Sequence, residues 1–203
     1  MLDSTLRPAK DRLFAVAART PLGRLHPTVI SSVGLAAGVA AALAAWQTKS
    51  ILAVGLWLFG RLADGLDGAV ARSTDRSSDT GGLVDFLFDT IGYAAIPLGL
   101  AFGLDERSVW IATAVLLASF YLNAVSLGYI AALLEKRASG VVARGQVTSV
   151  ALPRGFVEGT ETIVFFTLAL AVPDAAATIW WLMTVAVLIT VLERTRWAIG
   201  VLG

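Results

Sequence analysis

The sequence predicts an all-α membrane protein, with six transmembrane helices preceded by an N-terminal amphipathic helix on the membrane surface. Its 203 residues are 57% hydrophobic and only 15% charged, with a mean hydropathy of +0.76. Soluble domains carry about 25% charged residues, so this composition excludes an ordinary soluble fold. The absence of cysteine excludes disulfides and thiolate metal sites. Because we find no internal repeat and no long linker, we expect residues 1–203 to form one domain.

Residues 4–20 differ from the rest of the chain because they mix charged and apolar side chains. Arg7 and Lys10 are interspersed with Leu6 and Leu13, a pattern typical of a helix that lies along a membrane surface. No small-residue cleavage site follows a long apolar core here, so we do not interpret the segment as a signal peptide.

Six further stretches are apolar and long enough to cross a bilayer, whose hydrocarbon core needs about 20 residues per helix. If short polar interruptions are tolerated, they are residues 28–47, 51–72, 82–104, 108–134, 156–173 and 176–193. Six crossings place both chain termini on the same side of the membrane. Tryptophans lie mostly near the ends of these stretches, where we expect them to act as interfacial anchors. They are Trp46, Trp57, Trp110, Trp180, Trp181 and Trp197.

The distribution of lysine and arginine predicts the orientation. Of 16 such residues, all but Lys49 and Arg107 fall on the side that holds the termini, the 73–81 turn and the 135–155 loop. Cytoplasmic segments carry an excess of these residues. We therefore expect a multi-pass protein of a prokaryotic plasma membrane, with both termini and the aspartate site described next facing the cytoplasm.

Four aspartates in an otherwise apolar region are the main functional signal. They occur with one arginine and three small residues in the order Asp64-x2-Asp67-Gly68-x2-Ala71-Arg72-x8-Gly81-x3-Asp85-x3-Asp89. Left unpaired, four ionised aspartates at mid-membrane would cost roughly 10 kcal/mol, since each costs about 2.5–3.5 kcal/mol. Asp64 and Asp67 share one helix face, as do Asp85 and Asp89. A hairpin of the second and third spans would set these pairs opposite each other.

Carboxylate oxygens without histidine or cysteine ligands suit hard divalent cations such as Mg²⁺ or Mn²⁺. Two such ions about 3.5–4 Å apart form the arrangement used for displacement at phosphorus. Gly68 and Ala71 would let a phosphate or a flat ring approach the helix backbone, and Gly81 would leave room opposite them. Arg72 can form a two-point contact with a phosphate.

This spacing resembles the signature of the CDP-alcohol phosphotransferases, which it matches at all eight fixed positions. The resemblance implies a surface helix, six transmembrane helices and a homodimer. It also implies transfer of a phosphatidyl group from a CDP-activated lipid to an acceptor alcohol, with release of CMP and without any nucleic-acid partner. By the same resemblance, Asp64, Asp67 and Asp85 would be metal ligands for two divalent cations, and Asp89 both a ligand and the general base.

The resemblance also implies a nucleotide site, to which five residues of the motif would contribute. These are Asp64, Gly68, Ala71, Arg72 and Gly81. Family members often carry Pro-Asn-x-x-Thr at the start of the first span, where this chain has a looser Pro27-Thr28-Val29-Ile30-Ser31. Thr28 and Ser31 either line the nucleotide pocket or cap the helix.

The sequence defines the acceptor alcohol less well than it defines the metal and nucleotide sites. Members of the family that use inositol phosphate carry arginines, in a pattern like Glu-Arg-Pro-Glu-Arg, where this chain has Glu158-Gly159-Thr160-Glu161-Thr162. We therefore discount a phosphorylated inositol, unless Arg144 and Arg154 replace the missing contacts. Glu158 and Glu161 either bind a polyol or an amine, or form an interhelix salt bridge with Arg154 or Arg61.

Two other functions stay open. A membrane prenyltransferase also places a diphosphate on aspartate-bound magnesium, but those enzymes resemble longer chains with two separated aspartate-rich motifs. A cation transporter would use the aspartates as an ion pathway, but transporters usually show two related halves, and we find no such pairing.

Overall fold

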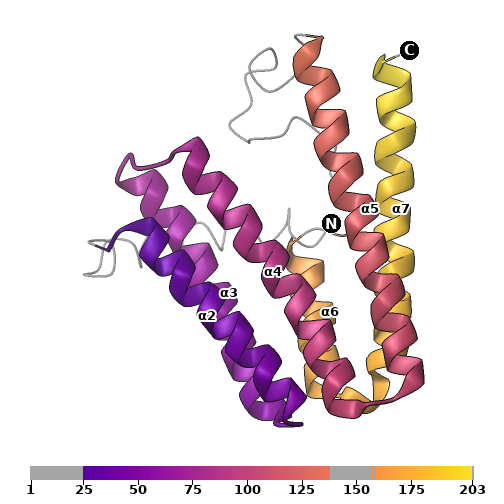
Figure 1. The fold of residues 1–203 in the computed structure, drawn as a ribbon. Coiled ribbons are helices and arrows are strands. Elements are labelled where there is room, and N and C mark those ends of the chain that lie inside the picture. The colour runs from indigo at the N-terminus through magenta and orange to yellow at the C-terminus, as the bar shows by residue number, and fades with distance from the viewer. Residues whose placement is uncertain (1–24, 138–156, 158, 203) are drawn as a thin grey trace.

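The computed structural model describes residues 25–137, 157 and 159–202, and every element in them is helical (Figure 1). The elements are α2 (Pro27–Trp46), α3 (Ser50–Ser73), α4 (Asp79–Leu104), α5 (Arg107–Lys136), α6 (Gly159–Ala171), η2 (Pro173–Ala175) and α7 (Ala176–Leu202). No strand occurs among these residues, which confirms the all-α class. The surface helix expected over 4–20 lies outside the described residues.

Among the described residues, six α-helices overlap the six predicted spans, although α7 continues to Leu202, beyond its predicted end at 193. In the same part of the chain, four helical segments are long and apolar enough to cross a membrane, namely α2, α4, α5 and the continuous segment Pro173–Leu202. These four confirm an integral membrane protein. Helix α3 has 24 residues but carries several charges, and α6 is apolar but only 13 residues long. A full crossing needs about 20 residues, so the count of six crossings stays a prediction.

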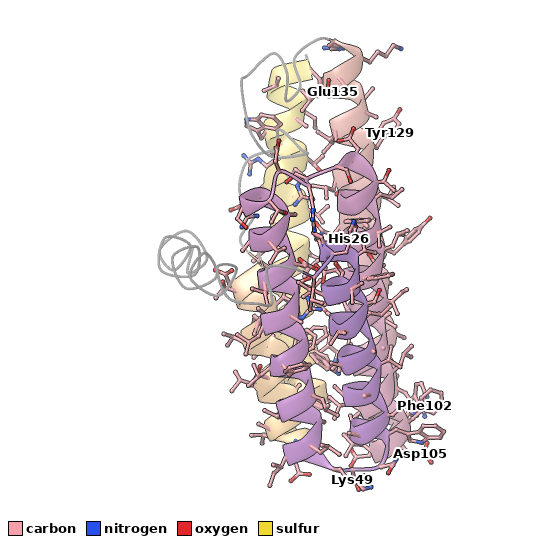
Figure 2. The ribbon with its side chains drawn as sticks, turned by 90° about the vertical axis from the view of Figure 1, so that its left-hand side faces the viewer. His26, Lys49, Phe102, Asp105, Tyr129 and Glu135 are labelled. Atoms are coloured by element: carbon pink, nitrogen blue, oxygen red, sulfur yellow. The ribbon has the colours of Figure 1, made fainter. Side chains whose placement is uncertain are left out.

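Successive helices run in opposite directions, so the turns alternate between the two ends of the bundle (Figure 1). Figure 2 shows Lys49 and Asp105 at one end and Glu135 at the other. The α3–α4 turn, which follows the first aspartate pair, lies toward the same end as Glu135 (Figure 1). The charge pattern predicts that Lys49 lies on the opposite side from most of the other lysines and arginines. The alternating turns agree with this prediction, because they place Lys49 at the other end of the bundle from the basic end of α5.

Helix α2 packs closely on α3 and α4 through small residues. Ala42 and Ala45 are buried on α2, and Gly99 and Gly103 face them from α4. A Cβ atom at Gly99 would overlap the backbone carbonyl of Ala42, and one at Gly103 would crowd the carbonyl of Ala45. Small residues therefore allow the two backbones to approach closely, as is common between membrane helices.

Replacing Gly99 by valine is expected to destabilise the protein by about 1–3 kcal/mol, the usual cost of overpacking a filled core. Gly55→Val is the matched control, because Gly55 is also helical and a Cβ there would meet no atom within 4 Å. Thermal unfolding of the detergent-solubilised variants compares the two. A melting temperature of the Gly99 variant equal to that of the control would contradict this packing.

Aromatic rings fill the core between α3, α6 and α7. Trp57 stacks on Phe166 with ring centroids 5.2 Å apart, and Trp180 meets Phe166 edge-on at 5.2 Å. All three side chains are completely buried. The prediction of interfacial anchors was therefore wrong for Trp57 and Trp180, because packing against α6 takes their rings into the core. Trp46 and Trp181 are exposed, as expected of anchors.

Candidate metal centre

The aspartate motif lies on the hairpin of α3 and α4, and its turn is formed by local interactions. The amide and hydroxyl of Thr74 both donate to the carbonyl of Val70, at 3.0 and 2.7 Å, where α3 ends. Asp75 adopts a left-handed conformation with φ of 53°. Ser78 then caps α4, since its hydroxyl oxygen accepts a hydrogen bond from the Gly81 amide at 3.1 Å. The loop composition of residues 74–78 therefore reverses the direction of the chain between α3 and α4.

Three of the four aspartates converge in this hairpin. One carboxylate oxygen each from Asp64, Asp67 and Asp85 lies within 4.8 Å of the others. Asp67 is only 5% exposed, and its Oδ2 atom is buried without a hydrogen-bond partner. A buried carboxylate oxygen without a partner is costly. A divalent cation fits this group, because it would supply the missing partner and offset three like charges with oxygen ligands of the preferred kind.

Asp89 lies beside this group but pairs with an arginine. Its Oδ1 atom accepts a hydrogen bond from Arg61 Nη1 at 2.5 Å, and the same nitrogen lies 3.8 Å from Asp64 Oδ2. Arg61, considered above as a partner of Glu158 or Glu161, thus links the two halves of the aspartate motif. The fourth aspartate is held toward α3 through this ion pair.

Sequence reasoning missed the importance of Arg61, whose side chain is only 8% exposed. Its guanidinium carbon lies 4.9 Å from the ring centre of Trp57 and 5.5 Å from that of Tyr93. Such cation–π contacts gain strength when the cation is removed from water. The available signal was an arginine within an apolar helix, three residues before Asp64, since charged residues inside membrane segments are usually functional.

The predicted nucleotide residues lie along the same hairpin. A Cβ atom at Gly68 would lie 3.2 Å from Arg72 Nη1, so glycine gives the guanidinium room to lie against α3. Ala71 is half-buried, while Arg72 and Gly81 are exposed. The amide of Gly81 is bound to Ser78, so this glycine also belongs to the cap of α4.

The capping role considered for Thr28 and Ser31 was wrong. His26 is the N-cap of α2 and makes no side-chain capping bond, while Pro27 occupies the first turn. The hydroxyl of Ser31 donates to the Pro27 carbonyl at 3.1 Å, and Ser31 lies within hydrogen-bonding reach of Asp67. Thr28 is exposed. Ser31 therefore brings α2 to the edge of the aspartate group.

Asp89 also lines a cavity of about 590 Å³ between α4, α5, α6 and α7. Most of the wall is apolar, including Phe86, Leu117 and Phe120. Neutral polar groups come from several further residues, among them Asn123, Thr162 and Thr190. Asn123 Oδ1 accepts a hydrogen bond from Arg194 Nη1 at 2.8 Å. Asp89 therefore stands between the aspartate group and a space large enough for a substrate.

The residues considered for acceptor binding are only partly within the described chain. Arg144, Arg154 and Glu158 lie outside the described residues. Glu161 is in the first turn of α6, and α6 contributes Gly159 and Thr162 to the cavity wall.

The sequence, taken with this geometry, matches a known family. The model of the CDP-alcohol phosphatidyltransferase family matches residues 24–192. The chain belongs to this family. It is therefore a transferase of substituted phosphate groups, which confirms the resemblance and the enzyme class predicted from the motif. Family membership decides against the prenyltransferase and the cation transporter.

Curated relatives extend over most of the chain. Inner membrane protein YnjF of Escherichia coli is 32% identical over 177 residues, which cover 85% of this chain and 83% of that protein. The phosphatidylinositol phosphate synthase of Mycolicibacterium smegmatis is 32% identical over 206 residues, covering 94% and 85%.

Solved structures of the Mycobacterium tuberculosis phosphatidylinositol phosphate synthase have a similar fold. The structure with CDP-DAG bound has a TM-score of 0.71 at 27% identity, and the match covers 92% of this chain and 94% of that one. The structure in complex with manganese and citrate has a TM-score of 0.69 at 26% identity, with 88% of each chain covered.

Proposed function

We propose that this enzyme transfers a phosphatidyl group from a CDP-activated lipid, such as CDP-diacylglycerol, to an acceptor alcohol and releases CMP. The observation that carries this proposal is the convergence of Asp64, Asp67 and Asp85 beside Asp89, which opens onto the cavity. Structures of a relative with CDP-DAG and with manganese support both the donor and the metal dependence.

Asp64, Asp67 and Asp85 would hold the divalent cations, with Asp89 as a further ligand of a two-ion site. When bound, Mg²⁺ or Mn²⁺ would neutralise the diphosphate of the donor and the charge that develops on it. Gly68, Ala71 and Gly81 would let the nucleotide approach the backbone. Arg72 would contact its phosphates, Asp64 would face it from the aspartate group, and Thr28 and Ser31 would flank it from α2.

The chemical step is a displacement at the lipid-side phosphorus. Asp89 takes the proton of the acceptor hydroxyl, and the oxygen so activated forms the new bond to phosphorus. The bond between this phosphorus and the CMP oxygen breaks, and CMP leaves with the electron pair. The products are a phosphodiester lipid, CMP and a protonated Asp89 that returns its proton to water.

The cavity beside Asp89 is the natural place for the acceptor. Asn123, Thr162 and Thr190 offer it neutral hydrogen-bonding groups. We propose Arg144, Arg154, Glu158 and Glu161 as further acceptor contacts. Glutamates suit a polyol or an amine better than an acceptor phosphate, which favours an uncharged or basic alcohol over phosphorylated inositol.

We further propose that residues 1–203 form one domain that crosses the membrane six times and assembles as a homodimer. Both termini and the aspartate site would face the cytoplasm, because the lysines and arginines concentrate on that side.

Incubation of the purified protein with CDP-diacylglycerol, Mg²⁺ or Mn²⁺ and a panel of alcohols tests this function. We expect CMP release that depends on one class of alcohol, together with a lipid product whose mass identifies that alcohol. Chelation of the metal should stop the reaction, and added Mn²⁺ should restore it. CMP release that persists after complete chelation would refute the metal-dependent transfer.

A further inference from the structure

We propose that Arg61 is a positioning residue that holds Asp89 between the aspartate group and the acceptor cavity. The inference rests on the proposed function, because it concerns the base of that reaction. Arg61 lies outside the eight-position motif, and its role follows from contacts within the hairpin of α3 and α4.

The guanidinium of Arg61 is held in place from several directions. Two aromatic rings lie against it, Trp57 from its own helix and Tyr93 from α4, at 4.9 and 5.5 Å. Trp57 is itself completely buried and stacks on Phe166 of α6, so its ring cannot easily move aside. With its side chain only 8% exposed, Arg61 is a cation with a defined position rather than a mobile surface group.

This fixed cation orients Asp89 by binding one of its two carboxylate oxygens. Nη1 lies 2.5 Å from Asp89 Oδ1 and 3.8 Å from Asp64 Oδ2. The contact with Asp89 joins α4 to α3 and restricts rotation of the Asp89 side chain. Asp89 also lines the cavity, and the hydrogen bond from Arg61 occupies only Oδ1, so Oδ2 is the oxygen that would receive an acceptor proton or a metal ion. A general base must lie within hydrogen-bonding distance of the proton that it removes.

The residue type suits this task. A planar guanidinium can lie against aromatic rings while one edge donates to a carboxylate, and a lysine ammonium cannot do both in the same way. Charge balance also favours an arginine at this position, because four carboxylates lie close together and buried charges require partners.

An alternative role is that of a placeholder, in which Arg61 binds Asp89 only until a metal ion takes over that carboxylate. The two roles predict different effects on kcat when Arg61 is removed.

Arg61→Met and Arg61→Lys separate these roles, with Arg107→Met as the control at the distant, exposed start of α5. Calorimetry with Mn²⁺ first counts the metal-binding sites in each preparation, and CMP release is then expressed per site at saturating Mn²⁺. We expect Arg61→Met to bind Mn²⁺ at least as tightly as the unmodified protein, since no metal ligand is lost. Its kcat should fall on the order of 100-fold, because misplacing a catalytic group by about 1 Å has such an effect.

In Arg61→Met, the KM for CDP-diacylglycerol should change less than about threefold, because binding of the donor does not depend on the base. A kcat per Mn²⁺ site within threefold of the unmodified protein would overturn the positioning role and identify a placeholder. If Arg61→Met does not fold, Arg61→Lys decides: a reduced kcat per site supports the inference, and an unchanged kcat overturns it. Failure of the proposed function is distinct, since the unmodified protein itself would then release no CMP.

Discussion

Asp67→Asn is expected to abolish CMP release and to remove high-affinity Mn²⁺ binding. Asp67 is the most buried member of the aspartate group, and its Oδ2 atom has no hydrogen-bond partner in the protein. The substitution keeps the shape of the side chain but removes a charge and an anionic ligand. Bound metal supplies several kcal/mol of transition-state stabilisation. Since each 1.36 kcal/mol is tenfold in rate, we expect a loss on the order of 10³-fold.

Calorimetric titration with Mn²⁺ and an assay of CMP release measure the two effects on the same preparation. Asp105→Asn is the matched control, because Asp105 is exposed and directly follows α4, whose end lies opposite the α3–α4 turn (Figure 1). It should leave both readouts unchanged. An Asp67→Asn protein that binds Mn²⁺ and turns over like this control would remove Asp67 from the metal site.

Asp89→Asn is expected to stop CMP release while largely preserving metal and nucleotide binding. Asp64, Asp67 and Asp85 remain as ligands, so Mn²⁺ binding should persist, although the loss of a fourth carboxylate weakens it. Asparagine keeps an oxygen that can accept from Arg61, which limits the structural disturbance. General base catalysis contributes about 10²–10⁴-fold, so we expect a loss in kcat of that size.

The distinguishing measurement is the difference between the two asparagine variants. Asp67→Asn should lose Mn²⁺ binding and turnover together, whereas Asp89→Asn should bind Mn²⁺ and a CDP-lipid but turn over about 10²–10⁴-fold more slowly. Equilibrium binding of CDP-diacylglycerol in the presence of Mn²⁺ provides the second readout. If Asp89→Asn retains near-normal turnover, another group must accept the proton of the alcohol.

The helices were the most predictable part of the structure. Long apolar stretches bounded by polar turns identified α2 to α5 and α7 to within a few residues at most boundaries, although α7 continues to Leu202, beyond the predicted end at 193. The burial of Trp57 and Trp180 was not predictable in the same way. Their positions along their helices gave no information about α6, whose Phe166 lies against both rings.

Part of the candidate site was also predictable from the sequence, and part was not. Spacings of three and four residues place Asp64 with Asp67, and Asp85 with Asp89, on common helix faces, and the polar turn indicates a hairpin. That local geometry brings the two pairs to the same turn, and the packing of α2 on both α3 and α4 helps to hold Asp64, Asp67 and Asp85 together. Arg61 was missed as the partner of Asp89 because 28 residues separate them, and several carboxylates lay within its reach.

The sequence by itself determined a helical membrane enzyme of one family and the aspartates that define its chemistry, because these depend on composition and on spacing within single helices. Only the tertiary structure decided which cation holds Asp89 and which helices enclose the cavity beside it. The pairing of Arg61 with Asp89 and the walls of the cavity both depend on how α4 to α7 pack around Trp57 and Phe166. Packing between distant segments is set by the shapes of many side chains at once, which no periodicity along the chain encodes.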